Sequence, residues 1–496
     1  KYGVDGRYDD ILRGKPCQYI TAMDALSRPM FLDSSPPPRS PKGADIELTL
    51  DEFIQSVAEQ ELDEACKSSG APGGCVLVMD PNNGEILAMA QYPRFDPNEY
   101  SKYPMANYRN RAISDAFEPG SLAKCFTMYA ALAMGVTRPD TVIRCEAGFS
   151  VGRKVIKDVP GTRYGDLTAT EILAKSNNVG TVKLALQCGE EALYQTFREF
   201  GMSGRTGVDL PSEGVCTIPR LSQWSKTTIA VLPYGYEMMA TPIGLCRAYA
   251  MIANGGRAIT PHVVRAVVNN ETHQRLEPKQ PYADQILSSE KTKMLAEMMT
   301  QCIEIGTGRH AKVPGFSGRI AAKSGTAVQL ERDEEGRGRG YSKDKVVASF
   351  IGFLPVEAPR AVISVHIWEP DAEGPTHGGE LAGPVFAKLA DYVATRMNMP
   401  RNTSEIETPT STPNSLAINK QKNQTPTPSV KDYLDQGVMP DVKGMTKGQV
   451  YELLKTLNLE GRFEGFGLAC SQQPEPGESL EQIQVCHVNF SDEQLR

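Results

Sequence analysis

Three short segments combine hydroxyl, lysine and amide side chains at spacings that suit acyl transfer. In chain order they are Ser121-Leu-Ala-Lys124, Ser176-Asn-Asn178 and Lys323-Ser-Gly-Thr326. A serine hydroxyl attacks an amide carbonyl when a base takes its proton, and a lysine can be that base only if its pKa falls from about 10.4. Burial of the first lysine beside the second is expected to lower that pKa. The set predicts a serine enzyme with a covalent acyl intermediate on Ser121.

The Ser-x-x-Lys spacing alone is not specific, because Ser288-Ser-Glu-Lys291 and Ser342-Lys-Asp-Lys345 match it as well. Ser121 differs in its context, since it follows Glu118-Pro-Gly120 and opens the most apolar helical segment. A helix N-terminus favours developing negative charge, and a lysine three residues on shares the helix face. Taken singly, Ser121 could equally be a helix N-cap and Lys124 a surface lysine. Ser288 is predicted to be an ordinary N-cap, and Ser342 to lie by a solvated charge run.

The other two segments favour the catalytic interpretation. Lys323-Ser-Gly-Thr326 lies in a strand of small residues, where Gly325 is expected to leave room for a substrate backbone along the strand edge. The alternative is a strand that ends in a turn, but the strand pattern continues to Val328. Ser176-Asn-Asn178 falls at a helix junction, where a cap is the alternative. Three such segments in this order are hard to obtain by accident.

Strand patterns at both ends of the central region enclose a helical middle. Asp51 is predicted to cap a helix through Ala65, and strands at 75–80 and 85–90 to form a hairpin around Pro81-Asn-Asn-Gly84. Further strands are expected at 319–328, 346–354 and 361–368, and helices at 121–134, 169–187, 242–254, 289–302 and 384–395. This arrangement predicts an α+β domain whose terminal segments share one antiparallel sheet flanked by helices, with an all-helical subdomain.

Composition shifts divide the chain into four parts. Residues 1–45 include the Pro/Ser-rich stretch Ser34–Pro38, and residues 46–397 hold the domain above. Residues 398–436 are rich in Thr, Ser and Pro and are predicted to be a disordered linker. Residues 437–494 are predicted to form a small βαβ-type module, whose helix is capped near Thr446. One face of that helix carries Val450, Leu453, Leu454 and Leu457. Cys470 and Cys486 are expected to face each other across its strands as a disulfide.

Bulk composition excludes several classes. The net charge of −7 argues against a nucleic-acid partner, which would favour a basic surface. The sequence contains no run of 18 or more apolar residues, so no transmembrane helix is predicted. The chain begins at Lys1 without a hydrophobic leader, which suggests a fragment. The 11 cysteines show neither a CxxC pair nor zinc-ligand spacing, so we expect no metal site and no cofactor.

Residues 46–397 resemble the transpeptidase domain of class B penicillin-binding proteins, particularly the division and sporulation type. Ser-x-x-Lys, Ser-Asp-Asn and Lys-Thr-Gly are the motif set of such enzymes and of class A β-lactamases. Further matching stretches are Val78–Ala90, Arg109–Ala112, Phe117–Ser121, Tyr234–Tyr236, Ala240–Pro242, Ala250–Gly256 and Ala348–Phe353. The tail, with Met439–Met445 and Ser471–Gly477, resembles a single PASTA repeat, and residues 1–45 are similar to the end of the family's N-terminal pedestal.

The resemblance implies a peptidoglycan D,D-transpeptidase that crosslinks stem peptides ending in D-Ala-D-Ala and is acylated by β-lactams. It implies that Lys124 is the base, that Ser176 relays a proton to the departing D-Ala, and that Lys323 polarises this relay. It further implies that Asn178 orients the peptide amide. The hydroxyls of Ser324 and Thr326, beside Gly325, would bind the terminal carboxylate of the donor peptide. The backbone N–H groups of Ser121 and Thr326 would form the oxyanion hole.

The same resemblance implies septal cell-wall synthesis beside a SEDS-family glycan polymerase and division proteins. It also implies a single-pass anchor in the cytoplasmic membrane, with this region outside. Two departures from the motif set are Ser324 for Thr, which keeps the hydroxyl, and Asn177 for Asp. A D,D-carboxypeptidase or β-lactamase, and a non-catalytic β-lactam sensor or scaffold, remain alternatives. Against a class A β-lactamase, no convincing Glu-x-x-x-Asn occurs between 178 and 323.

Overall fold

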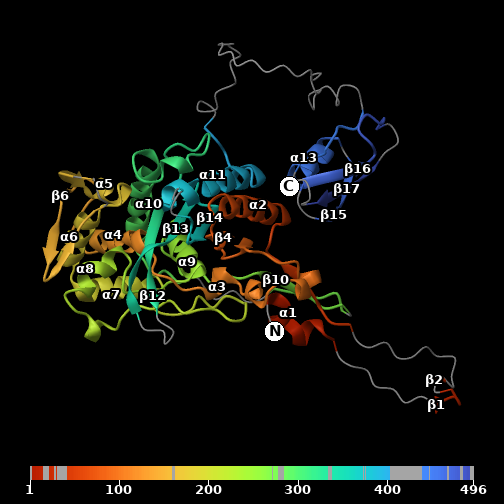
Figure 1. Cartoon of the computed structure of the whole chain (residues 1–496), viewed down its shortest axis with the longest axis horizontal. Coiled ribbons are helices and arrows are strands. Elements are labelled where there is room, and N and C mark those ends of the chain that lie inside the picture. Colours follow the sequence, from red (N-terminus) through yellow and green to blue (C-terminus); the bar gives the residue numbers. More distant parts are fainter. Residues whose placement is uncertain are drawn as a thin grey trace, which may run out of the picture. The chain divides into compact units, whose positions relative to one another are not determined.

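The structure is a computed structural model that falls into two compact units, residues 1–403 and 404–496 (Figure 1). The residues that it describes are 3–14, 22–26, 29–30, 42–158, 162, 164–270, 272–277, 284–332, 338–371, 374, 376–402, 438–445, 447–457, 459–465, 468–480 and 484–491. The Ser34–Pro38 connector, Thr446 and nearly all of the predicted linker lie outside these residues.

A five-stranded antiparallel sheet forms the centre of the first unit. In spatial order its strands are β12 (Ala321–Arg332), β13 (Gly338–Leu354), β14 (Ala361–Trp368), β4 (Gly73–Met79) and β5 (Ile86–Tyr92). Strands from the two ends of the domain therefore meet where β14 pairs with β4, as the sequence predicts, and the α+β class is confirmed. Because β12 lies at the edge, one side of its backbone pairs with no strand among the residues that the structure describes.

Helices cover both faces of the sheet. On one face α2 (Glu52–Ser68) and α11 (Gly378–Arg396) lie side by side and pack on β5, β13 and β14 (Figure 1). The predicted cap is confirmed, since the Asp51 carboxylate accepts from the N–H groups of Phe53 and Ile54. The helical region on the other face comprises α4 (Lys124–Ala133), α5 (Ala169–Ala174), α6 (Asn178–Cys188), α7 (Glu190–Glu199), α9 (Pro242–Ala253) and α10 (Ser289–Glu304), with the short α3 (Arg111–Ser114) and α8 (Thr228–Val231).

Two predicted helices have different bounds in the structure. The helix expected over 169–187 is two helices, α5 and α6, which end and begin on either side of residues 175–177. The helix expected from Pro384 begins at Gly378, so the proline lies inside it. Gly378 explains the earlier start, because a Cβ there would lie 2.2 Å from the carbonyl oxygens of Gly325 and Ser349. Only a glycine lets the helix approach the sheet so closely.

Smaller elements complete the first unit. β3 (Asp45–Leu48) joins β10 (Val264–Val268) and β11 (Arg275–Leu276) in a second sheet. Two hairpin-like pairs, β6 (Val142–Arg144) with β9 (Asp166–Thr168) and β7 (Phe149–Val151) with β8 (Lys154–Ile156), lie in the helical region. At the N-terminal end are α1 (Gly3–Leu12), β1 (Ala22–Met23) and β2 (Pro29–Met30). The short 3-10 turns are η1 (Pro97–Lys102), η2 (Met105–Tyr108), η3 (Gly120–Ala123), η4 (Leu221–Gln223), η5 (Leu232–Tyr234) and η6 (Arg309–Ala311).

The second unit packs one helix on one mixed sheet. Helix α13 (Lys447–Thr456) precedes β15 (Glu460–Gly465), β16 (Leu468–Gln473) and β17 (Val485–Ser491), and β17 lies between the other two strands. β15 and β17 are parallel, whereas β16 and β17 are antiparallel. Val450, Leu453 and Leu454 are buried in the core of this unit, as their spacing along the helix predicts.

The predicted disulfide of this unit is wrong, because Cys470 and Cys486 are separate thiols. The β16–β17 register shifts at Cys470, whose thiol donates to the carbonyl of Asn489, three residues beyond Cys486. Cys486 itself is buried in the core of the unit. The bulge turns one cysteine away from the other, which the alternation of residues along the strands does not reveal.

Candidate active site

The side chains of Lys124, Ser176 and Lys323 meet at one point. The Nζ atoms of Lys124 and Lys323 lie 3.1 Å and 3.0 Å from the Ser176 hydroxyl oxygen. Each Nζ group also donates to a carbonyl oxygen, that of Lys124 to Ser176 and that of Lys323 to Ser324. Segments 147 residues apart in the chain are thus joined through one hydroxyl group, which can pass a proton between its neighbours.

Burial changes the chemistry of both lysines. Lys124 is 1 % exposed and Lys323 is fully buried. Desolvation is the first cause that holds the pKa of Lys124 well below its usual value, and the charge of Lys323 is the second. Burial also lowers the pKa of Lys323. Both lysines are therefore more readily neutral than a solvated lysine, and for Lys124 this is the direction that the sequence predicts.

Ser176 reaches both lysines because its backbone is in the left-handed region, with φ 56° at the break between α5 and α6. This conformation costs a non-glycine residue about 1 kcal/mol or more, and such strain concentrates at functional sites. The cap of α6 is Asn177, whose side chain accepts from the N–H of Gly180. The alternative role of this motif as a helix cap therefore falls to Asn177 and not to Ser176.

Asp158, which no sequence motif indicated, holds this break in place. Its carboxylate accepts from the Asn177 side chain at 2.7 Å and from the Asn178 N–H at 2.5 Å. The Asn178 side-chain amide donates to the carbonyl of Lys157 at 2.8 Å, which leaves its own oxygen as the atom that could face a substrate amide. Asp158 lies between weak strand patterns, so no local signal in the sequence marks it.

Ser121 lies in η3, one turn before Lys124 at the start of α4. Its side chain is half-buried, and among the residues that the structure describes none forms a hydrogen bond with its hydroxyl. The other Ser-x-x-Lys serines are explained structurally. Ser288 caps α10, as predicted. The Ser342 hydroxyl accepts from the N–H groups of Asp344 and Lys345 in a solvent-exposed part of β13.

Gly120 sets Ser121 against the edge of β12. Its φ is 54°, its N–H donates to the carbonyl of Gly235, and a Cβ on Gly235 would lie 2.1 Å from the Gly120 oxygen. On its other side, a Cβ at Gly120 would lie 3.2 Å from the Thr326 oxygen. Two glycines therefore let the turn before the serine fit between the helical region and the strand.

The free edge of β12 presents a backbone donor at Thr326. The Val328 N–H leaves the sheet at this edge and donates to the Tyr236 hydroxyl at 3.4 Å. N–H groups alternate between the two sides of a strand, and the register is regular from Ala321 to Val328, so the Thr326 N–H points to the same edge. An N–H group beside Gly120 and Ser121 is suited to hold a developing oxyanion.

Ser324 and Thr326 present their hydroxyls to the N-terminus of α11. The Thr326 hydroxyl accepts from the Gly378 N–H at 3.0 Å, and the Ser324 hydroxyl lies 2.6 Å from that of Thr307. Thr326 keeps its own hydroxyl proton for another acceptor. The partial positive charge at this end of the 19-residue helix favours an anion nearby. Thr307 belongs to none of the sequence motifs, so the sequence did not indicate its place in the site.

Gly325 was expected to leave room for a substrate backbone, but its missing side chain faces the protein interior. A Cβ there would lie 2.8 Å from Cγ of Leu122 and 3.3 Å from the carbonyl oxygen of Pro119. The missing side chain makes room for η3 beneath the strand, not for a substrate at its edge. The glycine thus brings Ser121 and β12 together.

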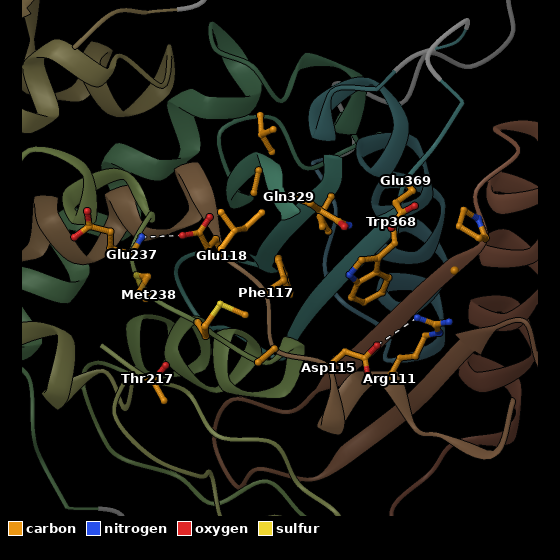
Figure 2. Close-up of a pocket in the computed structure, with 18 of the residues that line it drawn as sticks. Arg111, Asp115, Phe117, Glu118, Thr217, Glu237, Met238, Gln329, Trp368 and Glu369 are labelled. Atoms are coloured by element: carbon orange, nitrogen blue, oxygen red, sulfur yellow. Dashed lines mark hydrogen bonds and ion pairs between the residues drawn. The ribbon is translucent and has the colours of Figure 1, made fainter. Parts of the chain in front are cut away.

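A pocket of about 710 Å³ lies beyond Thr326 along β12 (Figure 2). The cross-strand row Ala327, Val347 and Trp368 forms its floor. Phe117 and Glu118, just before Ser121, form another wall, and Phe117 packs edge-on against Trp368 at 5.8 Å. No local pattern in the sequence marks this pocket, because its lining comes from seven separate segments.

Two further findings concern parts of the chain that the structure describes. Within them no helix is long and apolar enough to cross a membrane. Nor do their His, Cys, Asp and Glu side chains form a group of three or more that could hold a metal ion.

Comparison with known proteins gives two family matches. Residues 74–391 match the family described as penicillin binding protein transpeptidase domain, and residues 437–488 match the PASTA domain family.

Among individual proteins, the chain is 32% identical to peptidoglycan D,D-transpeptidase FtsI of Escherichia coli strain K12, over 80% of this chain and 63% of that protein. It is 28% identical to stage V sporulation protein D of Bacillus subtilis, over 99% of this chain and 72% of that protein. The crystal structure of penicillin binding protein 3 from Mycobacterium tuberculosis in complex with aztreonam is similar with a TM-score of 0.68. That match has 29% identity and covers 80% of this chain and 90% of the other. The chain spans less than two thirds of the FtsI protein.

Proposed function

Because the chain belongs to the penicillin-binding protein transpeptidase family and carries a PASTA domain, we propose that it is a serine D,D-transpeptidase of peptidoglycan. Its substrates would be stem peptides that end in D-Ala-D-Ala, joined through an acyl-Ser121 intermediate. The observation that carries the proposal is the Ser176 hydroxyl, which contacts the Nζ atoms of two buried lysines one turn from Ser121. The relatives' printed activity, D,D-transpeptidase, supports the reaction class.

In the proposed first step, neutral Lys124 accepts the proton of the Ser121 hydroxyl. The Ser121 oxygen then bonds to the carbonyl carbon of the penultimate D-Ala, and the carbonyl electron pair moves to its oxygen. The N–H groups of Ser121 and Thr326 would donate hydrogen bonds to this oxyanion. The low pKa of Lys124 supports its role as base, because a lysine with an ordinary pKa is protonated at neutral pH.

Collapse of the tetrahedral intermediate restores the carbonyl and breaks its bond to the nitrogen of the terminal D-Ala. That nitrogen takes a proton from Ser176, which takes one in turn from the Lys124 ammonium. The 3.1 Å contact between Lys124 and Ser176 provides the path. Free D-Ala leaves, Lys124 is neutral again, and Lys323 keeps the Ser176 hydroxyl oriented from 3.0 Å. An acceptor amine from a second stem peptide attacks acyl-Ser121 and returns its proton by the same route.

Substrate orientation would come from the two sides of β12. The terminal carboxylate would accept from the hydroxyls of Ser324 and Thr326 beside Gly325, near the positive end of α11. The Asn178 side chain would bind the peptide amide. A β-lactam would follow the same course as a strained mimic of D-Ala-D-Ala and leave Ser121 acylated. Aztreonam bound to the M. tuberculosis protein supports β-lactam binding by this fold.

The wider role is proposed on the same basis. The similarity to FtsI and to a sporulation protein supports septal or spore cell-wall synthesis. The natural protein would be anchored in the cytoplasmic membrane with this region outside, and would work with a SEDS-family polymerase and division proteins. Residues 1–45 would be the end of a pedestal, 46–397 the transpeptidase domain, 398–436 a linker and 437–494 the PASTA domain, which overlaps the matched range 437–488.

Covalent labelling by a fluorescent penicillin tests the nucleophile. We expect the wild-type chain and Ser342→Ala, a matched Ser-x-x-Lys control, to be labelled on one residue, and Ser121→Ala to stay unlabelled. Label that persists in Ser121→Ala would refute the assignment, and a folded wild-type chain without label would contradict acyl transfer. A D-Ala-D-Ala donor with an added D-amino acid distinguishes the alternatives. Aminolysis supports a transpeptidase, hydrolysis alone a carboxypeptidase or β-lactamase, and an inert acyl-enzyme a sensor.

A further inference from the structure

The pocket beyond Thr326 has two chemically different ends (Figure 2). Glu118 lies at one end, close to Ser121 in the chain. Arg111 and Asp115 lie at the other end beside Trp368, and Figure 2 shows Phe117 and Gln329 between these ends. Arg109 also lines the pocket. The mechanism proposed above uses none of these side chains.

The arginine end holds two guanidinium groups and two carboxylates, those of Asp115 and Glu369, and Glu369 is paired with Lys345 at 2.9 Å. Asp115 is shared by both guanidinium groups, at 2.7 Å from Nε of Arg109 and 3.3 Å from Nη1 of Arg111. Because Glu369 is paired with Lys345, Asp115 is the carboxylate that faces the two arginines, and it offsets only one of their charges. The guanidinium of Arg111 is held in place, because it lies 6.0 Å from the Trp368 ring centre and against Gly73, where a Cβ would approach it to 3.1 Å. A fixed guanidinium with unused N–H groups is suited to bind a carboxylate.

The position of the catalytic cluster decides which peptide reaches this end. Lys323, and through it Ser176, lies on the N-terminal side of Thr326, so the leaving D-Ala departs in that direction. The acceptor amine replaces the leaving group and must arrive from the same side. The acyl part of the donor then extends the opposite way, along Ala327 to Leu330, where the pocket begins. The Val328 N–H already donates to the Tyr236 hydroxyl and cannot bind the donor peptide. The donor peptide therefore leaves the strand edge there and turns into the pocket.

The dimensions agree with this direction. Trp368 is two strands from Ala327, and neighbouring strands are about 4.8 Å apart, so the arginine end lies about 10 Å from β12. An extended peptide advances about 3.3 Å per residue. The backbones of the two residues upstream of D-Ala-D-Ala would lie about 3–7 Å beyond the scissile D-Ala, and a side chain that carries a carboxylate extends the reach further.

We infer that the Arg109–Arg111 pair is a subsite for a free carboxylate in the donor stem peptide, upstream of its terminal D-Ala-D-Ala. This inference rests on the proposed function. The carboxylate has two chemical sources, the side chain of the residue just before D-Ala-D-Ala or a γ-linked glutamate one residue farther. Amidation of that carboxylate would remove the charge that the arginines recognise, so the subsite would distinguish acidic from amidated donors.

The test compares acylation by three synthetic donors, read as D-Ala release. One carries a free carboxylate on the residue before D-Ala-D-Ala, one carries it on the preceding γ-linked glutamate, and one is amidated at both places. We expect one acidic donor to exceed the amidated donor about tenfold in kcat/KM, the value of one charge-assisted hydrogen bond at a half-exposed site. The acidic donor that is preferred identifies the source of the carboxylate.

Variants locate the effect. In Arg109→Gln/Arg111→Gln the preference is expected to fall to about one, whereas Arg360→Gln, an exposed arginine at the opposite end of the same strands, should retain it. If the double variant does not fold, the preference is measured in Arg109→Gln alone, whose side chain is 60% exposed and therefore tolerates substitution. Equal rates with all three donors would overturn the subsite while leaving the transpeptidase proposal intact. No D-Ala release and no penicillin label in the wild-type chain would instead refute the proposed function.

Discussion

At the scale of single residues, the site depends on one hydroxyl that two buried lysines share. Ser176 is held in a left-handed conformation that costs energy, and its oxygen lies within 3.1 Å of both Nζ atoms. Those contacts place the Nζ atoms no more than about 6 Å apart, where two positive charges at an effective dielectric of 20 repel by about 3 kcal/mol. Ionisation of Lys124 is therefore linked to the charge on Lys323.

The pH dependence of acylation should reveal this link. Lys124 acts in its neutral form, so the rate of penicillin acylation is expected to fall about tenfold per pH unit below its lowered pKa. Lys323→Met removes a positive charge, which raises the pKa of Lys124. The acidic limb of the profile should then move to higher pH by about one unit. The measurement is the position of the limb in stopped-flow labelling, separate from the overall loss of rate.

An exposed lysine gives the control for this profile. Lys312→Met removes the same charge from a solvated side chain and should leave the limb where it is in the wild-type chain. If Lys323→Met lowers the rate without moving the limb, Lys323 acts only through its hydrogen bond to Ser176. A limb that moves to lower pH would contradict Lys124 as the base.

At the scale of elements, glycines let three segments approach closely enough to form the site. Gly325 makes room for Leu122 of η3, Gly235 for the backbone of Gly120, and Gly378 for the carbonyls of β12 and β13. The strand edge, the nucleophile turn and the start of α11 therefore fit together only without these side chains. Packing of this kind transmits a local change directly to the position of Ser121.

Gly325→Ala should expose this dependence. The added methyl group would lie 2.8 Å from Cγ of Leu122, so we expect a loss of about 1–3 kcal/mol in the free energy of unfolding and slower penicillin acylation. Urea unfolding and labelling rates measure the two effects. Gly165→Ala, where a Cβ would meet nothing within 4 Å, should change the free energy by less than about 0.5 kcal/mol.

A double-mutant cycle with Leu122→Ala makes the test specific. Leu122→Ala alone opens a cavity and should cost about 2–5 kcal/mol. In the double variant the alanine at 325 gains the vacated space, so the losses should be less than additive by about 0.5–3 kcal/mol. Strict additivity would mean that the two residues do not oppose each other.

At the scale of the whole molecule, the chain places its candidate chemistry in one of two units. Every motif residue and the pocket lie within residues 1–403. The second unit has a core of its own, formed by α13 and three strands. A unit with its own core can in principle fold alone.

A chain that ends at Thr403 should therefore keep its acyl chemistry. We expect its penicillin acylation rate to stay within about twofold of that of the full chain and its thermal midpoint to match that of the larger unit. Labelling kinetics and calorimetry check both expectations, with the full chain as reference. A truncated chain that folds but is acylated at least tenfold more slowly would assign the PASTA domain a part in the reaction.

The sequence by itself determined the elements and the kinds of groups that could react. The α+β class, the Asp51 cap and the strands on both sides of the helical middle follow from local periodicity and capping, which neighbouring residues decide. The position of Ser121 one turn before Lys124 follows in the same way, because both lie in one short stretch of η3 and α4. Those predictions need only contacts between residues close in the chain.

Only the tertiary structure decided how distant groups meet. It brought Ser176 to both lysines, placed Asp158 under the helix break, and showed that Gly325 faces Leu122 and not the edge of the strand. It also separated Cys470 from Cys486 by a bulge, and it assembled the arginine pocket from seven segments. The reason is physical: side-chain direction and strand register depend on packing between segments far apart in the chain, and a single sequence carries no direct record of those contacts.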